Sequence, residues 1–278
     1  MAIITISREM GSGGIPISHK AAEKLGYTLI DGESIRAVAA NYGLTPDAVE
    51  KADEKPPAFV DKMDAQTEID FFRVELIILE YALKGNVIIY GRGGQDLLQS
   101  IDSVLRVRII APFEERVERW AEREWLDPEL ARVLVRKSDQ QRAGFIKYYF
   151  DRNWEDPLHY DLLINTAKLS NDTAVKLICE GIKDKNLAEN KTQGKQVLQD
   201  RIIAKRIEIE LLSRRVVDGL HRYHFHLQVE KGQVQLSGHL HSEAQRSDVL
   251  AIVKDVEGIK GVTDQVEIRH YRSTPDEH

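Results

Sequence analysis

The sequence predicts an α/β domain built on a parallel β-sheet, followed by a small α+β module. Over roughly the first 170 residues, short apolar runs alternate with longer segments of helical period, which is typical of a parallel sheet with helices on both faces. Two runs, Val87–Tyr90 and Arg108–Ala111, are apolar along most of their length, as central strands buried on both faces are. After a polar stretch the pattern becomes helix, hairpin, helix and strand.

Apolar runs and helical periods place the elements of the first domain. The strands are expected at Ile3–Ser7, Thr28–Asp31, Val87–Tyr90, Val107–Ala111 and Leu162–Asn165. The helices are expected near Ile17–Leu25, Glu33–Asn41, Ala65–Leu83, Glu114–Arg123 and Pro128–Lys147. Gly26 and Gly85 follow two of these helices directly, and glycine commonly ends a helix at that position.

The segment 184–199 is polar and keeps no apolar period, so we interpret it as a linker between domains at 1–183 and 200–272. The second domain is expected to contain a helix near Arg201–Val217, a hairpin, a helix near Ala244–Val256 and a strand near Val262–Arg269. This order predicts an αββαβ module.

Composition excludes several classes of protein. The 278 residues are 42% hydrophobic, enough for a folded core at a length where cores tend to split in two. Cys179 is the single cysteine, which excludes an internal disulfide framework. The sequence shows neither a signal peptide nor an apolar run of about 20 residues. The net charge of −6 argues against a general nucleic-acid binder. We therefore expect a cytoplasmic protein without a nucleic-acid partner or membrane span.

A glycine-rich loop follows the first strand and precedes a helix, with the sequence Ser7-Arg8-Glu9-Met10-Gly11-Ser12-Gly13-Gly14. Glycines let successive backbone N–H groups converge on an anion, and the helix N-terminus adds its positive dipole end. The phosphate-loop motif G-x-x-x-x-G-K-[ST] continues with a lysine and a hydroxyl, where this chain has Ile15 and Pro16. The pattern predicts a phosphate loop without its lysine; the alternative is an ordinary strand-to-helix turn.

Further short motifs follow this loop in a defined order along the chain. They are Ala22-Glu23-Lys24-Leu25-Gly26, Leu29-Ile30-Asp31, Val87-Ile88-Ile89-Tyr90-Gly91-Arg92-Gly93-Gly94, Arg106-Val107-Arg108-Ile109-Ile110-Ala111-Pro112, Lys137-Ser138-Asp139-Gln140-Gln141-Arg142, Tyr148-Tyr149 and Tyr160-Asp161-Leu162-Leu163-Ile164-Asn165-Thr166. Together they make residues 2–180 resemble the nucleoside-monophosphate kinases, most closely the bacterial cytidylate-kinase-like family. The resemblance implies a P-loop kinase-like, five-stranded parallel sheet. It also implies a helical insert around 35–84 that binds the acceptor and a mobile lid around 114–150.

The resemblance also implies roles for individual residues. Gly11–Gly14 would cradle the donor phosphates, and Arg92 would grip an acceptor phosphate through its guanidinium fork. Asp31 would face the acceptor. Asp139 and Arg142 match the acidic and basic positions of the lid, where an arginine neutralises charge on the phosphoryl group in transfer.

Three further arginines, Arg116, Arg119 and Arg123, recur at helical spacing on one face of the lid. We take Arg116 as a phosphate-binding candidate. For Arg119 and Arg123 we favour a solvated helix face.

The departures from the family pattern concern charge. Relatives that lack the loop lysine commonly have a basic residue after the last glycine, where this chain has Ile15. Arg8 or Lys20 are the candidate substitutes for that cation, and Ser12 or Ser18 for the hydroxyl that holds Mg²⁺. Because phosphoryl transfer depends on positioning and charge neutralisation, nucleotide binding is favoured over efficient catalysis.

Three functions of different classes remain open at this point. The first is an ATP-dependent phosphotransferase, with Mg²⁺ if it is catalytic, that acts on a nucleoside monophosphate or similar small acceptor. The second is a non-catalytic nucleotide sensor that regulates, or is regulated by, the C-terminal module. The third is a scaffold that uses both domains for protein contacts. An oligomer is compatible with all three.

The C-terminal hairpin shows the period of a half-buried sheet. Apolar Tyr223, Phe225, Leu227 and Val229 alternate with polar residues, as do Val234, Leu236 and Leu240 after a turn at Lys231-Gly232. Gly238 falls on the core side and suggests close packing of a helix. The segments Lys231–Gly238, Ser242-Glu243 and Val256–Val262 make residues 198–271 resemble the BON domain of bacterial proteins. Such domains are linked to membrane lipids, partner proteins or small ligands.

Four histidines fall on the outward face of this hairpin. Pairing Glu230 with Gln233 across the turn sets His224 opposite His239, with His226 and His241 as diagonal neighbours. Neutral imidazoles bind Zn²⁺ and similar ions, and protonated imidazoles repel one another near pH 6. The cluster is therefore a candidate metal site or a face that senses pH or contacts a partner; the alternative is an exposed polar face, which we favour.

Overall fold

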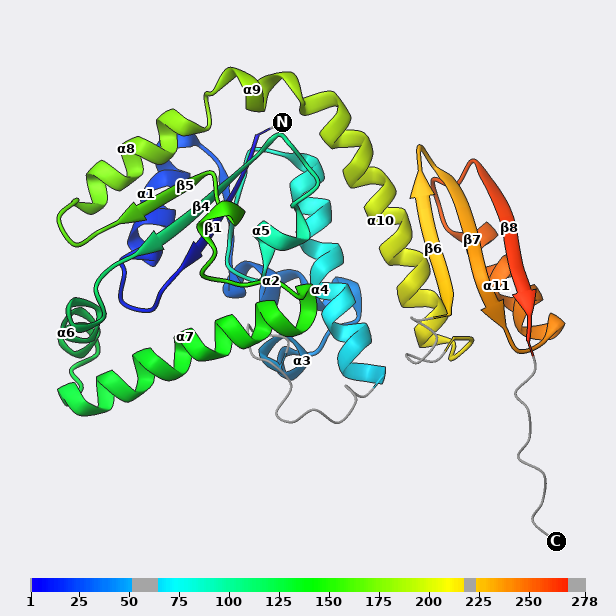
Figure 1. The fold of residues 1–278 in the computed structure, drawn as a ribbon, viewed down its shortest axis with the longest axis horizontal. Helices are drawn as coiled ribbons and strands as arrows, with labels where there is room; N and C mark the ends of the chain where they lie inside the picture. The colour runs from blue at the N-terminus through cyan, green and yellow to red at the C-terminus, as the bar shows by residue number, and fades with distance from the viewer. Residues whose placement is uncertain (1, 52–64, 218–223, 270–278) are drawn as a thin grey trace, which may run out of the picture.

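The computed structural model describes residues 2–51, 65–217 and 224–269. Five parallel strands form the first sheet in the order β2-β3-β1-β4-β5 (Figure 1), which confirms the predicted α/β class. The strands are β1 (Ile3–Arg8), β2 (Thr28–Ile30), β3 (Val87–Tyr90), β4 (Val104–Ile110) and β5 (Leu162–Asn165). All five lie where the sequence predicts them, although β4 begins three residues before the expected Val107.

Helices cover both faces of this sheet. They are α1 (Gly14–Leu25), α2 (Gly32–Val38), η1 (Ala39–Tyr42), α3 (Pro46–Lys51), α4 (Ala65–Lys84), α5 (Gly94–Leu97), α6 (Phe113–Glu124), α7 (Pro128–Phe150), η2 (Pro157–His159) and α8 (Asn171–Gly181). Ile4 and Ile6 pack under α1 and α8, whereas Ile3 packs under α4 on the opposite face. Each of these isoleucines is fully buried, which stabilises the fold by about 1.5–3 kcal/mol per side chain.

The predicted insert and lid correspond to α2–α4 and to α6–α7. Residues 52–64 of the insert lie outside the described residues, and the motion of the lid stays a prediction. No helix within the described ranges is both long and apolar enough to cross a bilayer.

Most of the segment 184–199 is helical, although the sequence shows no apolar period there; its role as a linker stays a prediction. It holds α9 (Lys185–Glu189) and the first turns of α10 (Lys191–Ser213). The polar residues of this segment show no helical period, because the contacts that stabilise the helix are made with residues distant in sequence. Gly194 packs closely against two of them: a Cβ at this position would lie 2.7 Å from the hydroxyl of Ser103 and 3.0 Å from Ile101. The exact division into domains stays a prediction.

A three-stranded sheet forms the second domain, in the order β6-β7-β8. Its elements are β6 (Phe225–Glu230), β7 (Gln233–Leu240), α11 (Glu243–Asp255) and β8 (Gly261–Ile268). Glu230 pairs with Gln233 as predicted, and β8 adds parallel to β7. Tyr223 and residues 270–272, which were also assigned to this module, lie outside the described residues.

Gly238 does not mark the approach of a helix, in contrast to the expectation. Its φ of 96° lies in the left-handed region, and a Cβ there would collide with the carbonyl of His224, the residue that precedes β6. Glycine is required by the hairpin itself.

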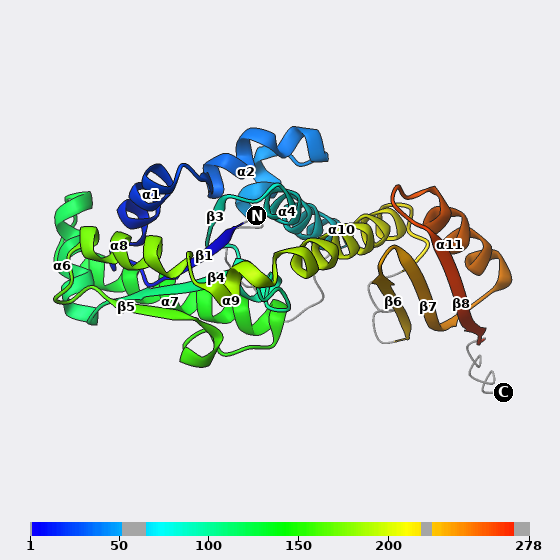
Figure 2. The same ribbon diagram turned by 90° about the horizontal axis from the view of Figure 1, so that it is seen from above.

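Helix α10 runs from the first domain to the second sheet (Figure 2). Leu198 and Ile202 belong to the core that α4 shares with the first sheet, whereas Ile203 and Ile207 belong to the core beneath the second sheet. The two domains therefore share one helix.

Candidate active site

The glycine loop lies between β1 and α1 and has a backbone that only glycine adopts easily. Gly11 and Gly13 have φ angles of 81° and 88°, in the left-handed region. A Cβ at Gly11 would also collide with the carbonyl of Arg116, and one at Gly14 would lie 2.8 Å from Cγ of Arg8. The first N–H groups of α1 have no acceptor within the helix, so the loop presents donors to an anion.

A cavity of about 200 Å³ opens in front of the loop. Four arginines from three elements line it: Arg8 ends β1, Arg119 and Arg123 come from α6, and Arg142 comes from α7. The remaining lining residues are Glu9, Met10, Gly11, Gly13, Gly14, Ile15, Pro16, Tyr90 and Trp120. Three of the four guanidinium groups also contact a carboxylate: Arg119 pairs with Glu115, Arg123 with Glu124 and Arg142 with Asp139. The glycine loop and the four arginines together make the cavity a candidate site for an anion.

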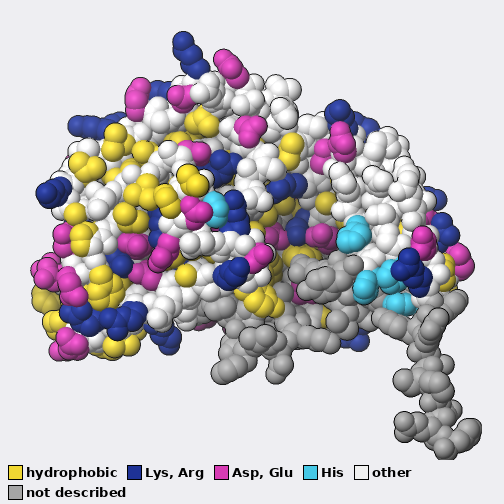
Figure 3. Space-filling model, viewed as in Figure 1, with side chains coloured by type: hydrophobic (Ala, Val, Ile, Leu, Met, Phe, Trp, Pro, Cys, Tyr) yellow, Lys and Arg dark blue, Asp and Glu magenta, His cyan; other side chains and the backbone are white. Residues whose placement is uncertain are grey.

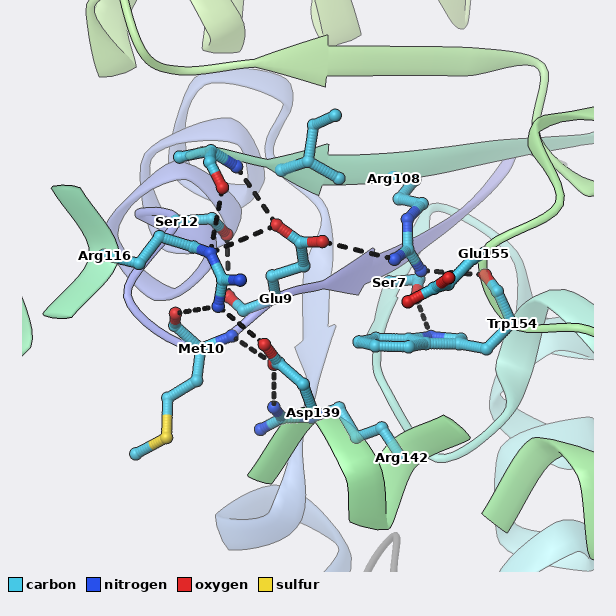
Figure 4. A network of polar contacts seen from close by, with 12 residues as sticks. Ser7, Glu9, Met10, Ser12, Arg108, Arg116, Asp139, Arg142, Trp154 and Glu155 are labelled. Carbon is cyan, nitrogen blue, oxygen red and sulfur yellow. Dashed lines mark hydrogen bonds and ion pairs between the residues drawn. The ribbon is translucent and has the colours of Figure 1, made fainter. Parts of the chain in front are cut away.

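Arg116 and Asp139 lie behind the loop rather than on the cavity wall (Figure 4). The Arg116 side chain, 7% exposed, donates to Asp139 Oδ2 across 2.6 Å and to the carbonyl of Met10 across 3.0 Å. The other oxygen of Asp139 accepts from the amide of Met10 at 3.0 Å. The structure therefore does not bring Arg116 to the phosphate position expected for it. Both side chains fix the loop from α6 and α7.

Glu9 joins this network from the loop itself. Its carboxylate lies 3.2 Å from Nε of Arg116 and 3.6 Å from Arg108, and it accepts from the amide of Ala111. Burial raises the pKa of Glu9, and the two arginines offset that rise only in part. Arg108 in turn stacks over the ring of Trp154 at 4.0 Å. The network ties the ends of β1 and β4 together.

Arg119 and Arg123 are solvated as expected, with side chains 38% and 50% exposed, but both also line the cavity. Arg119 donates to the hydroxyl and the carbonyl of Thr166 at 3.1 and 3.0 Å. The Thr166 hydroxyl donates to the carbonyl of Ser12 at 2.8 Å, so the end of β5, α6 and the loop are joined. Arg123 lies over the ring of Trp120 at 4.8 Å. The helical spacing of Arg116, Arg119 and Arg123 predicts that they share one face of the helix. It does not predict whether that face contacts the loop.

Arg92 and Asp31 lie at the ends of β3 and β2, outside the lining of the cavity. Arg92 has a φ of 58°, and its guanidinium would lie 2.5 Å from a Cβ at Gly32. Asp31 caps α2, accepting from the amide and hydroxyl of Ser34 at 2.9 and 2.8 Å. Burial would raise the pKa of Asp31, but these hydrogen bonds outweigh it and hold the pKa below its usual value. The pair marks a second polar position, beside Gly32 at the carboxyl edge of the sheet, where α/β proteins bind ligands.

The remaining candidates lie away from the cavity. Lys20 pairs with Asp172 of α8 at 2.9 Å, so it does not replace the loop lysine. The hydroxyls of Ser12 and Ser18 are buried and donate to the carbonyls of Glu9 and Ile15, each at 2.8 Å. Neither hydroxyl is presented as a Mg²⁺ ligand.

Histidines gather on one face of the second domain (Figure 3). The rings of His224 and His239 lie 4.5 Å apart, as the predicted register requires, and His241 lies 6.3 Å from His239. Among the described residues, no group of three or more His, Cys, Asp or Glu is arranged to hold a metal ion. The cluster is therefore not a metal site as it stands.

Comparison with known proteins finds relatives of the first domain. A cytidylate kinase from Natronomonas pharaonis is 33% identical over 172 residues, covering 61% of this chain and 83% of the relative. One from Archaeoglobus fulgidus is 30% identical over 189 residues, covering 66% and 96%. An uncharacterized protein from Eubacterium ventriosum, 24% identical, has the same fold with a TM-score of 0.52 over 66% of this chain and all of its own.

Family models match two parts of the chain. Residues 199–270 match the BON domain, in agreement with the three-stranded sheet and its helices. Residues 3–168, which include the glycine loop and all four arginines of the cavity, match the cytidylate kinase-like family. The chain belongs to the cytidylate kinase-like family and carries a C-terminal BON domain.

Proposed function

We propose that this protein transfers a phosphoryl group from ATP to a nucleoside monophosphate or a similar small acceptor. The observation that carries the proposal is the meeting of the glycine loop with four arginines in one cavity, beside a second cationic position at Arg92. A donor bound at the loop would direct its terminal phosphate toward the carboxyl edge of the sheet. The curated relatives are named as cytidylate kinases, which supports a nucleotide as the acceptor.

The arginines take over the work of the absent loop lysine in this proposal. Phosphoryl transfer needs positioning and charge neutralisation rather than covalent chemistry. Arg8 would hold the donor phosphates from the strand side, and Arg119 and Arg123 from α6. Arg142, whose guanidinium lies 3.6 Å from Asp139, would neutralise charge in transfer. A hydrogen bond to a charged group contributes about 1.5–3 kcal/mol.

ATP and Mg²⁺ fit this chain unequally. The glycine loop and its arginines suit the phosphates of ATP. For Mg²⁺, the two candidate hydroxyls, Ser12 and Ser18, already donate to backbone carbonyls. Mg²⁺ commonly keeps several waters and binds through substrate phosphates. The roles proposed for the four arginines of the cavity do not require a side chain of the protein to bind Mg²⁺.

A nucleotide sensor is the second candidate function. Its support is the replacement of the loop lysine by Ile15, together with the pairing of Lys20 to Asp172 outside the cavity. Such a protein would bind a nucleotide without turnover. Its BON domain, joined through α10, would transmit or receive the signal.

A coupled assay of ADP release over a panel of nucleoside monophosphates and sugar acids separates the two, with ATP binding followed by calorimetry. Turnover of one acceptor supports the kinase. Saturable ATP binding without turnover of any acceptor supports the sensor, and absence of both refutes each.

Arg123→Gln and Arg132→Gln form a matched pair for the same assay. Arg132 lies on α7 and pairs with Glu114 at the surface, outside the cavity. We expect Arg123→Gln to weaken ATP binding about ten-fold and Arg132→Gln to leave it unchanged. Equal losses would show that the cavity is not the donor site.

A further inference from the structure

Helix α10 of the BON domain contacts the part of the first domain that is expected to bind the acceptor. We propose that Arg206 on this helix is a positioning residue for the acceptor site: through Glu80 it fixes Tyr42, and with Tyr42 the segment that faces Arg92. The proposal rests on the proposed function, because it assigns the acceptor to the side of Arg92. In this proposal a residue of the BON domain supports the acceptor site from outside it.

The contact between α10 and α4 is buried and charged. Lys205 lies 2.8 Å from the carboxylate of Glu75, and the two side chains are 15% and 8% exposed. The same ammonium lies 3.7 Å above the ring of Phe72. Lys205 also pairs with Glu208 of its own helix at 2.8 Å. Separation of the two helices would leave the buried Glu75 without this cation, which favours one relative position of α10 and α4. The BON domain is anchored here to a helix of the predicted insert.

Farther along α4, the carboxylate of Glu80 links this helix to α10 and to η1. Its Oε1 accepts from Arg206 at 2.8 Å, and its Oε2 accepts from the hydroxyl of Tyr42 at 2.6 Å. Burial, and then the carboxylate of Glu80, raise the pKa of the Tyr42 phenol far above its usual value. Arg206 orients the carboxylate that holds Tyr42.

Tyr42 ends the segment that begins beside Arg92. Helix α2 starts at Gly32, against the guanidinium of Arg92, and η1 follows it directly and ends at Tyr42. A shift of Tyr42 therefore moves a short helical segment whose other end forms the surroundings of Arg92. The relay runs from Arg206 through Glu80 and Tyr42 to that arginine.

A second contact of α10 involves the segment that follows Arg92 in the sequence. Arg201 donates to the carbonyl of Leu97 and, at 2.8 Å, to the hydroxyl of Ser100. Leu97 ends α5, which begins two residues after Arg92. Both segments that flank Arg92 are thus held by α10.

The donor cavity is built from other elements. Its lining residues come from β1, the glycine loop, α1, the end of β3, α6 and α7, and α10 contributes none of them. Loss of the relay should therefore weaken acceptor binding and leave donor binding as it is.

Steady-state kinetics on the full chain test this with Arg206→Gln, Tyr42→Phe and the double variant. We expect the acceptor KM to rise about five-fold in each single variant, which lies within the usual range of coupling between sites. The double variant should show no further rise, because both changes break one relay. Arg206→Lys, which keeps a cation opposite Glu80, should recover part of the loss. The ATP KM and kcat should stay within about two-fold of the parent.

Arg246→Gln is the matched control. Arg246 pairs with Asp264 at 2.7 Å inside the BON domain, so the variant weakens that domain without touching the relay. It should leave the acceptor KM unchanged. Equal rises in the KM of ATP and acceptor, or the same rise in Arg246→Gln, would overturn the proposal and leave only a structural role for Arg206.

Hydrogen exchange gives a readout that needs no turnover. Arg206→Gln and Tyr42→Phe should speed amide exchange in residues 39–43 relative to the parent and to Arg246→Gln; unchanged exchange there overturns the relay. If the parent turns over no acceptor, the proposed function fails and the acceptor role of Arg206 fails with it. The exchange result then still decides whether Arg206 holds Tyr42.

Discussion

Arg116 donates to Asp139 across 2.6 Å directly behind the glycine loop. The contact joins α6 to α7, and Asp139 then holds the amide of Met10 in the loop. The shape of the loop is therefore set by two helices that follow it by more than 100 residues in sequence. We therefore expect a movement of α6 or α7 to shift the loop.

Asp139→Ala tests this connection. Removing one partner leaves the buried Arg116 facing Glu9 alone, so we expect a loss of about 3 kcal/mol in unfolding free energy. ATP binding should weaken as well, because the amide of Met10 loses its acceptor. Urea unfolding and calorimetry measure the two effects. Lys147→Ala, which removes an exposed pair with Asp151, should change neither; equal effects of both variants would contradict the assignment.

Ile15→Lys places a cation where the phosphate-loop motif has its lysine. Ile15 is 39% exposed and lines the cavity, so a longer side chain fits without disturbing the core. We expect ATP binding to tighten about ten-fold through one added charge-assisted contact. Ile15→Met is the control of similar length without charge. If Ile15→Lys binds ATP no better than Ile15→Met, the phosphates do not lie beside this residue.

His239 should make stability depend on pH. Partial burial, and then His224, Arg269 and His241, lower the pKa of His239, whereas Glu267 opposes them. A histidine whose pKa is lower in the folded protein contributes stability that is present above about pH 6.5 and is lost as pH falls through the folded pKa. The unfolding temperature of the parent should therefore fall more between about pH 7 and pH 5 than that of His239→Gln. Parallel curves would show that the cluster is an inert polar face.

The shared helix predicts that the two domains unfold together. Leu198 and Ile207 are both fully buried, the first in the core of the first domain and the second in that of the BON domain. Leu198→Ala and Ile207→Ala should each cost about 2–5 kcal/mol. In differential scanning calorimetry, both should shift one common transition. Two transitions, each moved by only one variant, would mean that α10 does not couple the cores.

The sequence by itself determined the strands of both sheets and most of the longer helices, but not α3, α5, α8 or α9. Apolar runs such as Val87–Tyr90 identified the strands, because a central parallel strand must be apolar on both faces. Glycine spacing identified the loop between β1 and α1, because its backbone requires left-handed residues. The pairing of Glu230 with Gln233 followed from the turn, since a two-residue turn fixes the register of a hairpin.

The tertiary structure alone decided which side chains meet. The sequence placed Arg116, Arg119 and Arg123 on one helix face, but whether that face meets the loop or solvent depends on how α6 packs. Lys20 and Asp172 are 152 residues apart, and no local pattern predicts their pairing. The first turns of α10 were missed for the same reason: a polar segment becomes helical where distant residues such as Ile101 and Ser103 cover it. Local propensity fixes elements, whereas contacts between distant residues fix the site.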